Sequence, residues 1–378
     1  MKTGSCRICP DNFIRLRNMP SAFPVISTQV VVAAFPVGMV KASDMAVVQT
    51  ALPPLADGQV LIETEYLSLD PAIRYWLNPT DTYVPGAKIG EPVRCFAAGR
   101  ISASQHPDFV VGDVCSGLLN AQSHVIYDVI ESAKIGMGLT RCDLGLGPLS
   151  QHLGVLGMPG MTAYFGLLER GKPVAGNSVF VSAASGTVGA TVGQIAKLKG
   201  CRVVGSAGSA EKCRWLVEEM GFDAAFDYKS ESAAVALKRL QPNGVDVYFD
   251  NVGGDTLDGV LLNLARGARV VLCGALSMYN TQCHEGGNAG LRNYMKLIMA
   301  RATMNGIVVF DFFPQWPQAT AEIAGWLKSG QLHAAEHIEV GIEKFPQALV
   351  ALFAGAHKGK QLVQVVPNQR APGLAAAT

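Results

Sequence analysis

The chain has 378 residues, enough for two domains of ordinary size, and 49% of them are hydrophobic, enough to fill two cores. Its 31 basic and 30 acidic residues give a net charge of +1, so no charged field attracts nucleic acid or an anionic membrane surface. We therefore expect a folded globular protein that has neither of these as a partner.

The cysteines and the uncharged stretches bear on where the protein resides. Nine cysteines, odd in number and scattered, predict reduced thiols in a cytoplasmic protein rather than a disulfide framework. Residues 173–196 carry no charge, but Gly, Ser, Thr, Asn and Gln interrupt the stretch, so we do not expect it to span a membrane.

The first part of the chain predicts a flexible extension followed by short strands. Residues 1–24 lack hydrophobic periodicity and contain three prolines, which favours a flexible N-terminal extension. Strands are then predicted at 30–34, 45–49 and 59–67, separated by Pro and Gly turn signals. This pattern indicates a β-rich, partly open barrel over residues 25–155.

The segment from Gly176 to Lys212 predicts a strand, a glycine turn, a helix and a second strand. The N-terminus of such a helix offers free backbone N–H groups and a positive dipole to a pyrophosphate, and small residues let the phosphate approach the backbone. The turn alone is weak evidence, because the same glycines could serve only tight packing. The residues of the turn are Ala184, Ser185, Gly186, Thr187, Val188 and Gly189.

The end of the second strand indicates which dinucleotide would bind. An NAD-binding unit carries an acidic residue there for the ribose hydroxyls. In this chain the strand ends in small residues that include Gly208 and Ser209, and Lys212 follows. A lysine and small hydroxyl groups suit a 2′-phosphate, which a carboxylate would repel, so the sequence predicts NADP(H).

Strands and helices continue to alternate after this unit. We predict a helix at 162–169 ahead of it, strands at 226–228, 245–251 and 268–274, and helices at 232–240, 256–264 and 319–329. Further strands are expected near Ile338 and at 362–366. This alternation is typical of a doubly wound parallel sheet, so the predicted fold class is α/β.

Five motifs, in this order, resemble the medium-chain dehydrogenase/reductase superfamily. They are Ser68 to Arg74, Gly157 to Tyr164, Ala184 to Gly189, Phe249 to Gly254 and Gly274 to Asn280. Within that superfamily the chain is similar, over residues 28–366, to the zinc-free branch of prostaglandin reductases, alkenal double-bond reductases and curcumin reductase.

The resemblance implies a fold and a reaction. It implies a GroES-like β-barrel domain, residues 25–155 and 331–370, clasping a Rossmann NADP(H)-binding domain, residues 156–330. The implied reaction is reduction of the C=C bond of α,β-unsaturated ketones or aldehydes with NADPH. The expected assembly is a homodimer.

The resemblance also assigns residues to the site. Ala184, Gly186 and Gly189 would contact pyrophosphate, and Lys212 and Tyr228 the 2′-phosphate. The nicotinamide ribose would lie along Asn251, Cys273, Gly274, Ala275 and Leu276. Arg74 and Tyr279 are expected beside the substrate. This chain departs from the family's pattern at two positions. It has Ala72 where the family has a tyrosine, which should open the substrate cleft, and His357 where the family has an asparagine that contacts the cofactor.

Conjugate reduction needs a donor for the carbonyl oxygen, where negative charge develops. Tyr279 follows the carboxyl end of a predicted parallel strand, where ligands bind in such sheets, so its hydroxyl is the expected donor. The alternative is a tyrosine that only packs on the cofactor. Solvent could supply the proton for the α-carbon.

No metal is expected. The zinc-dependent relatives carry a Gly-His-Glu run and a Cys-His pair near residue 69, and this chain has neither. His333, Glu336 and His337 match an H-x-x-E-H pattern, but that chemistry needs both histidines on one helix, and the sequence around them predicts a strand. Two other functions stay open: reduction of quinones, and nucleotide binding without turnover.

Overall fold

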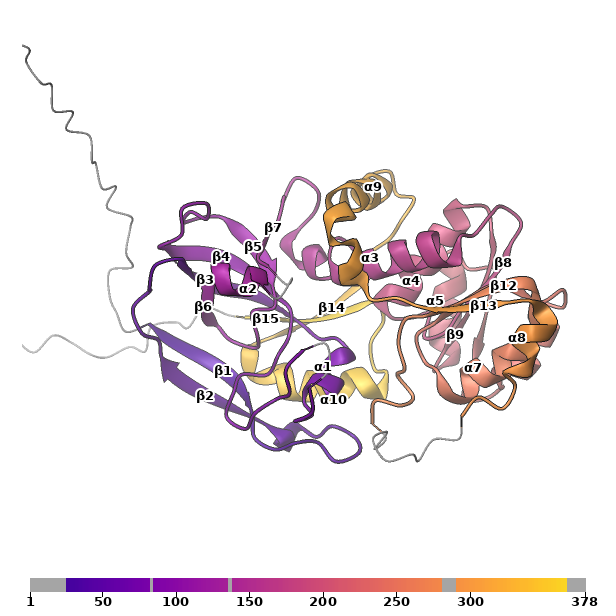
Figure 1. Cartoon of the computed structure of the whole chain (residues 1–378), viewed down its shortest axis with the longest axis horizontal. Coiled ribbons are helices and arrows are strands. Elements are labelled where there is room, and N and C mark those ends of the chain that lie inside the picture. The colour runs from indigo at the N-terminus through magenta and orange to yellow at the C-terminus, as the bar shows by residue number, and fades with distance from the viewer. Residues whose placement is uncertain (1–24, 82–83, 135–137, 281–289, 366–378) are drawn as a thin grey trace, which may run out of the picture.

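The computed structural model describes residues 25–81, 84–134, 138–280 and 290–365, which form two halves, each built around its own sheet (Figure 1). The expected N-terminal extension, residues 1–24, and the end of the predicted barrel segment, residues 366–370, lie outside the described residues. No helix in the described ranges is long and apolar enough to cross a membrane.

One half contains a six-stranded parallel sheet with the strand order β10-β9-β8-β11-β12-β13. Because the chain runs outward from β8 in one direction and from β11 in the other, a crevice forms between the carboxyl ends of these two strands. The prediction of a doubly wound α/β fold is therefore confirmed. The strands are β8 (Ser178–Val181), β9 (Arg202–Ala207), β10 (Ala224–Asp227), β11 (Val245–Asp250), β12 (Leu264–Leu272) and β13 (Thr303–Gly306).

Helices cover both faces of this sheet, as Figure 1 shows. Side chains alternate along each strand, so Val179 and Val181 pack against the helices on one face, while Phe180 packs against those on the other. The first face carries α3 (Met158–Phe165), α4 (Thr187–Leu198), α5 (Ala210–Glu218) and α9 (Trp316–Lys328). The second face carries α6 (Ala233–Leu240), α7 (Gly254–Leu261) and α8 (Met295–Ala300).

The other half is built from mainly antiparallel strands, with the order β14-β15-β3-β4-β5-β7 and with β6 also paired to β3. A separate hairpin-like pair joins β1 and β2. The strands are β1 (Ile26–Val32), β2 (Met45–Ala51), β3 (Gln59–Ser68), β4 (Ala97–Ser104), β5 (Val114–Gly117), β6 (His124–Asp128), β7 (Thr140–Arg141), β14 (Glu336–Val340) and β15 (Lys360–Gln364). Its helices are α1 (Ala72–Trp76), α2 (Val129–Lys134) and α10 (Phe345–Ala354).

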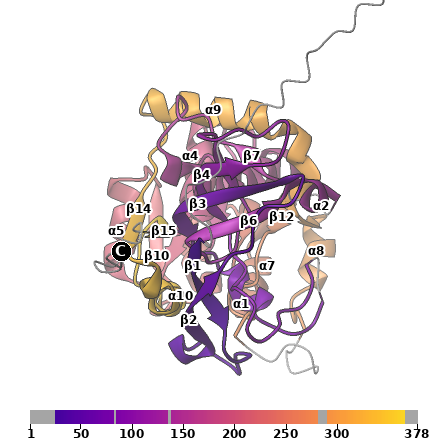
Figure 2. The ribbon, with the colours of Figure 1, turned by 90° about the vertical axis from the view of Figure 1, so that its left-hand side faces the viewer.

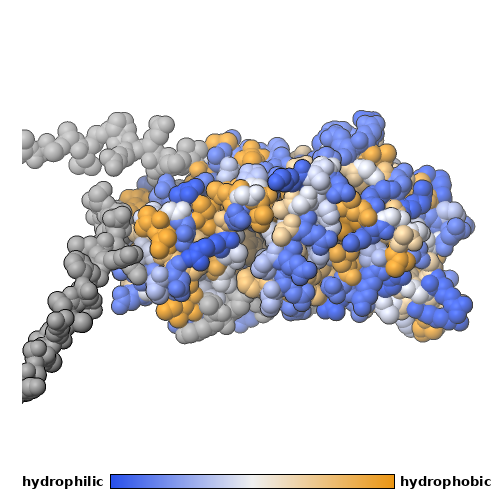
Figure 3. All heavy atoms as spheres, turned by 90° about the horizontal axis from the view of Figure 1, so that it is seen from above, coloured by the Kyte–Doolittle hydropathy of each residue, from blue (hydrophilic) through white to orange (hydrophobic). Residues whose placement is uncertain are grey.

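The last strands of the chain join the first ones. Strand β15 pairs with β3 although almost 300 residues separate Ser68 from Leu362 in the chain. Figure 2 shows the same arrangement from the side of the antiparallel half. In Figure 3 apolar and polar residues are interspersed over the visible face, and a recess separates its two halves.

Some predicted elements have other limits. The helix expected at 162–169 begins four residues earlier, because Pro159 suits the first turn of a helix, and it ends at Phe165 in a wider helical turn. The helix expected to reach residue 264 ends at Leu261, because β12 begins at Leu264. Helix α10 was not predicted, since its nearly continuous apolar run gives no clear period.

A buried ion pair holds β15 against the start of α1. The ammonium of Lys360 lies 2.6 Å from Asp70 Oδ1 and also donates to the carbonyl oxygen of Leu69 at 3.0 Å. Both charged side chains are less than 9% exposed, and Ser68 donates to the second carboxylate oxygen. The pair therefore joins the two ends of the antiparallel half.

We expect Lys360→Met to lower the free energy of unfolding by about 3–5 kcal/mol, because Asp70 is left buried without its counter-ion. The exposed Lys358, which pairs with Glu211 at 3.0 Å, is the matched control, and Lys358→Met should cost less than about 1 kcal/mol. Urea unfolding measures both. The double variant Asp70→Asn/Lys360→Met should recover part of the loss, and an equal loss for both lysine variants would contradict the argument.

Candidate active site

The predicted glycine turn lies at the crevice between β8 and β11. Helix α4 begins after Gly186, and no side chain caps it, so the N–H groups of its first turn have no acceptor within the helix. A Cβ atom at Gly189 would lie 2.6 Å from the carbonyl oxygen of Ala183, so only glycine allows this close approach. Ala183 itself has a left-handed φ of 47°. The turn thus presents bare backbone to a ligand.

A groove of about 420 Å³ runs over this turn. It brings together eleven of the predicted cofactor residues, from both halves of the molecule. They are Ser185, Gly186, Thr187, Val188, Gly189, Gly208, Lys212, Tyr228, Asn251, Leu276 and His357. The antiparallel half contributes Met39, Asp70 and the loop before β15, so the groove lies along the seam between the halves.

One end of the groove is cationic. Lys212 and Lys229 lie there with Tyr228, and a Cβ atom at Gly208 would meet the ring of Tyr228 at 3.3 Å. Burial, and then the charge of Lys229, lowers the pKa of Lys212. Among the described residues that line the groove, Asp70 is the only one with a carboxylate, and Lys360 neutralises it. This end is therefore suited to a phosphate group.

Three residues of the groove wall hold buried polar atoms that have no partner among the described residues. These atoms are His357 Nδ1, Asn280 Oδ1 and Gln361 Oε1. Such atoms are costly to bury unless a ligand or water pairs with them. The bare turn, the cationic end and these unpaired atoms fit a dinucleotide that carries an additional phosphate.

His357 lies between Lys212 and Lys360 on the loop that precedes β15. Its pKa is lowered to about 4, mainly by burial and then by the charges of Lys212 and Lys360. The loop is fixed to the glycine turn, because Gly359 donates to the carbonyl oxygen of Ser185 at 2.9 Å. Lys212 in turn donates to the carbonyl oxygen of Gly355 at 2.7 Å. His357 is therefore held neutral in a cationic environment.

The carboxyl end of β11 is organised by Asp250, which is fully buried. It accepts hydrogen bonds from the Tyr248 hydroxyl at 2.6 Å and from the backbone N–H of Val252 and Gly253 at 2.9 Å. Burial raises the pKa of Asp250. The neighbouring Asn251 donates from its side chain to the carbonyl oxygen of Ser182 at 2.7 Å, which joins β11 to β8 at the crevice.

The segment after β12 begins behind the groove wall and reaches it at Leu276. Cys273 and Gly274 donate their backbone N–H groups to the carbonyl oxygen of Asp250, and burial raises the pKa of the Cys273 thiol to about 12. Tyr279 does not line the groove, although its neighbours Ser277 and Asn280 do. Its hydroxyl accepts from the backbone N–H of Ala275 at 3.3 Å, and its ring lies 6.3 Å from that of Tyr75.

Three other predicted residues lie away from the groove wall. Ala184 is fully buried, where its Cβ packs beneath Gly205. Ser209 caps α5 by accepting from the N–H of Lys212 and is not among the residues that line the groove. Arg74 is 3% exposed, and its guanidinium donates to the carbonyl oxygens of Pro36 and Gly38. Its guanidinium also donates to the side chain of Asn78 at 3.0 Å, and Arg74 is not among the residues that line the groove.

The sequence analysis missed several wall residues. Lys229 follows Tyr228 directly and could have been found by extending the phosphate argument by one residue. Met39 and Phe353 come from segments that the topology alone brings to the groove. Among the residues that the structure describes, no group of three or more His, Cys, Asp or Glu side chains is placed to hold a metal ion.

The chain matches two protein families and several known enzymes. Residues 28–135 match the family of the N-terminal domain of oxidoreductases, and residues 187–325 match the family described as zinc-binding dehydrogenase. The chain is 39% identical to the NADP(+)-dependent 2-alkenal reductase of Nicotiana tabacum over 90% of this chain and 98% of that enzyme.

Two further relatives are also linked to NADPH by their names. The NADPH-dependent curcumin reductase of Escherichia coli (strain K12) is 40% identical over 82% of this chain and 88% of that enzyme. The crystal structure of CurA from Vibrio vulnificus in complex with NADPH superimposes with a TM-score of 0.82, at 36% identity, over 90% of this chain and 99% of that chain. The protein therefore belongs to the medium-chain dehydrogenase/reductase superfamily, in the branch of the alkenal, curcumin and prostaglandin reductases.

Proposed function

We propose that this protein is an NADPH-dependent reductase of the C=C bond of α,β-unsaturated ketones or aldehydes. The observation that carries the proposal is the groove, which joins a bare glycine turn at the sheet crevice to a cationic end with no unpaired carboxylate among the described lining residues. Relatives named as NADP-dependent alkenal and curcumin reductases support the cofactor and the reaction type.

We further propose which residues bind each part of the cofactor and which belong to each domain. The backbone of Gly186 to Gly189 would hold the pyrophosphate, and Lys212, Lys229 and Tyr228 the 2′-phosphate. Residues 156–330 would form the cofactor domain, and residues 25–155 and 331–370 the catalytic domain. Arg74 would act as a positioning residue, because it holds the loop that carries Met39 to the groove.

When bound, NADPH supplies the hydride that adds to the β-carbon of the substrate. Negative charge then develops on the carbonyl oxygen, which needs a preorganised donor. The O–H of Tyr279, whose oxygen accepts from the N–H of Ala275 at 3.3 Å, would supply it after the side chain turns toward the groove. No zinc ligand is needed in this scheme, so we propose catalysis without metal.

Assays of NADPH oxidation test the function directly. NADPH oxidation should be fast with an enone such as 3-nonen-2-one, slower with a quinone and negligible without acceptor, and it should persist in the presence of a strong chelator. Faster turnover of quinones than of every enone would favour quinone reduction instead. Tight NADPH binding without turnover of either acceptor would indicate a nucleotide-binding protein.

We also propose a cytoplasmic homodimer. Among the strands that the structure describes, β13 lies at one edge of the parallel sheet, and α8, which packs on the neighbouring β12, exposes Met295, Ile298 and Met299 by 54–71%. An apolar helix next to an unpaired strand edge is typical of a surface that a second copy covers. The six cysteines in the described ranges are all free, which supports a reducing compartment.

Lys212→Ala should weaken NADPH binding about 10- to 150-fold, because it removes a charge-assisted hydrogen bond worth about 1.5–3 kcal/mol. NADH affinity should hardly change, since NADH has no 2′-phosphate. Titration of cofactor fluorescence measures both affinities. Lys358→Ala, which removes a neighbouring cation that pairs with Glu211, is the control and should leave the preference intact. Equal affinity of the wild type for both cofactors would contradict the proposal.

Binding of NADPH should raise the pKa of His357 from about 4, because phosphate charge offsets Lys212, so the complex binds more protons than the free protein. Affinity for NADPH should therefore rise as the pH falls from 6.5 toward 4. Calorimetry at pH 5.5 in two buffers of different ionisation enthalpy counts the protons taken up. His357→Asn should reduce that count, and an identical count in both proteins would contradict the prediction.

Tyr279→Phe should lower kcat for enone reduction by about 10²-fold or less while leaving NADPH affinity nearly unchanged, because it removes one oxyanion donor. If the ring only packs on the cofactor, NADPH affinity should fall and kcat should hold. Steady-state kinetics with a separate binding titration distinguish the two. Tyr75→Phe, which alters the neighbouring ring, is the matched control.

A further inference from the structure

Three ionisable side chains form a row across the antiparallel half, and we call Glu336, Lys360 and Asp70 the charged row. Glu336 of β14 and Lys360 of β15 are partners in the parallel register. Their side chains therefore leave the sheet on the same face, from strands that lie about 4.8 Å apart. The ammonium of Lys360 extends to Asp70, whose Oδ1 lies 2.6 Å away. The row thus runs without interruption from β14 to the start of α1.

The two ends of the charged row border different spaces. Asp70 and Lys360 line the groove. Glu336 lines another cavity of about 450 Å³, here called the outer cavity, between α5 and the loop before β15. The walls of the outer cavity include the exposed side chains of Glu219 and His337, so solvent reaches it. The charged row therefore connects a polar, solvent-filled space with the groove.

A small cavity of about 10 Å³ is lined by both Glu336 and Lys360. Thr187 and Thr191 of α4 add hydroxyl groups to its wall. This volume suits about one water molecule, and a water needs polar partners such as these. A proton can pass between two side chains through one such water. The small cavity therefore provides the step from Glu336 to Lys360.

The surroundings of Glu336 leave one of its oxygens available for a proton. Its Oε2 accepts from the Ser150 hydroxyl at 2.9 Å, while its Oε1 is buried and has no partner among the described residues. Burial raises the pKa of Glu336, and the bond from Ser150 and the charge of Lys360 oppose that shift. Tyr66 of β3 stays protonated beside it, because burial and the charges of Glu65 and Glu336 raise its pKa. The other ionisable residues that line the outer and small cavities are Glu211, Lys212, Glu219, His333, His337, His357 and Lys358.

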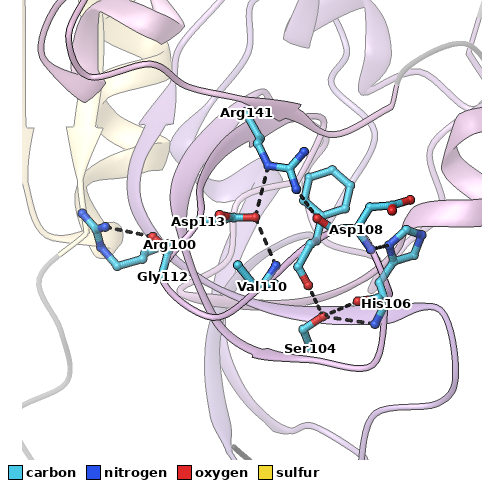
Figure 4. Close-up of polar contacts among 9 residues, drawn as sticks. Arg100, Ser104, His106, Asp108, Val110, Gly112, Asp113 and Arg141 are labelled. Atoms are coloured by element: carbon cyan, nitrogen blue, oxygen red, sulfur yellow. Dashed lines mark hydrogen bonds and ion pairs between the residues drawn. The ribbon is translucent and has the colours of Figure 1, made fainter. Parts of the chain in front are cut away.

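Asp70 also lines a further cavity, of about 510 Å³, whose basic residues do not act as its proton donors. Arg141 on that cavity's wall is held with its Nε 3.1 Å from a carboxylate oxygen of Asp113, as Figure 4 shows. A guanidinium does not release its proton in proteins. Burial lowers the pKa of His152, so its ring is neutral at pH 7. The donor that Asp70 contacts directly is Lys360.

We propose that the charged row delivers the proton that completes the reduction. The inference rests on the proposed function, in which hydride addition to the β-carbon leaves an enolate that needs one proton at its α-carbon. Asp70 takes a proton from Lys360 and releases it to the enolate, which becomes the saturated carbonyl product. Lys360 regains a proton from Glu336 through the small cavity, and solvent in the outer cavity protonates Glu336 again. Each turnover thus consumes one hydride and one proton.

Glu336→Gln keeps an acceptor for Ser150 but cannot carry a proton. General acid catalysis contributes about 10²–10⁴-fold, and water in the open groove replaces part of it, so kcat for 3-nonen-2-one should fall about 10- to 100-fold. The solvent isotope effect on kcat should rise, and NADPH affinity should not change. Imidazole, a small proton carrier that can enter the outer cavity, should restore part of the rate. Glu219→Gln, which removes a carboxylate of the outer cavity outside the charged row, is the matched control and should behave as the wild type.

Lys360→Arg tests the next step of the path. Arginine keeps the positive charge beside Asp70 but does not release its proton. The variant should lose kcat like Glu336→Gln, and imidazole should not restore it, because the block lies beyond the outer cavity. If Lys360→Arg does not fold, the comparison of Glu336→Gln with Glu219→Gln decides alone.

Infrared titration of the cofactor-free protein tests the coupling within the charged row without turnover. The carboxyl band that Glu336→Gln removes gives the pKa of Glu336. In Asp70→Asn/Lys360→Met, which leaves no unpaired buried charge, this pKa should be higher, because the ammonium that lowers it is gone. Lys358→Met, which removes an exposed ammonium of the outer cavity, should leave it unchanged.

The outcomes separate this inference from the proposed function. If enones are reduced and Glu336→Gln matches Glu219→Gln in rate and isotope effect, the proposed function stands and the inference is overturned. If no enone is reduced, the proposed function fails. The infrared titration then still decides whether the charged row is coupled: a raised pKa of Glu336 in the double variant supports the path, and an unchanged pKa overturns it.

Discussion

The close packing around the glycine turn and α4 is the constraint on which the site depends. A Cβ atom at Gly193 would lie 1.9 Å from the ring of Phe222, and one at Gly205 would lie 2.9 Å from the Cβ of Ala184. Gly193 thus leaves room beside α4 for Phe222, while Gly189 of α4 and Gly205 of β9 leave room for the turn at Ala183 and Ala184. This close packing holds the N-terminus of α4 at the crevice between β8 and β11. The glycines are therefore needed for packing, and the same close contacts leave the backbone of the turn open to the pyrophosphate proposed above, so the two interpretations of the turn are compatible.

The second constraint is the return of the chain to its beginning. The loop before β15 donates from Gly359 to Ser185, and Lys360 enters the antiparallel half to meet Asp70. A single short segment thus contacts the glycine turn, the cationic end and the start of α1. The groove consequently depends on the relative position of both halves. A substitution in β15 should therefore change the geometry of the groove as well as the stability of the protein.

Local patterns explain why much of this was predictable. The strand, turn and helix around Gly186 involve neighbouring residues, so composition and period were sufficient, and the small residues with Lys212 at the end of β9 indicated the phosphate. Met39 and Phe353 could not be placed in the same way, because their positions follow from how distant segments pack. Helix α10 was missed because Phe345 to Ala354 is apolar on nearly every side.

The fold was easier to predict from the sequence than the roles of individual residues that the family resemblance implied. Arg74 belongs to a motif that suggested substrate contact, yet its buried guanidinium is used by the Pro36 to Gly38 loop. Asp70, from the same motif, was assigned no role, yet it lines the groove. A motif specifies a local backbone path, whereas the tertiary packing decides which of its side chains reaches a ligand. In this chain that packing places the acid at the seam, where the ion pair with Lys360 keeps it from repelling an anionic cofactor.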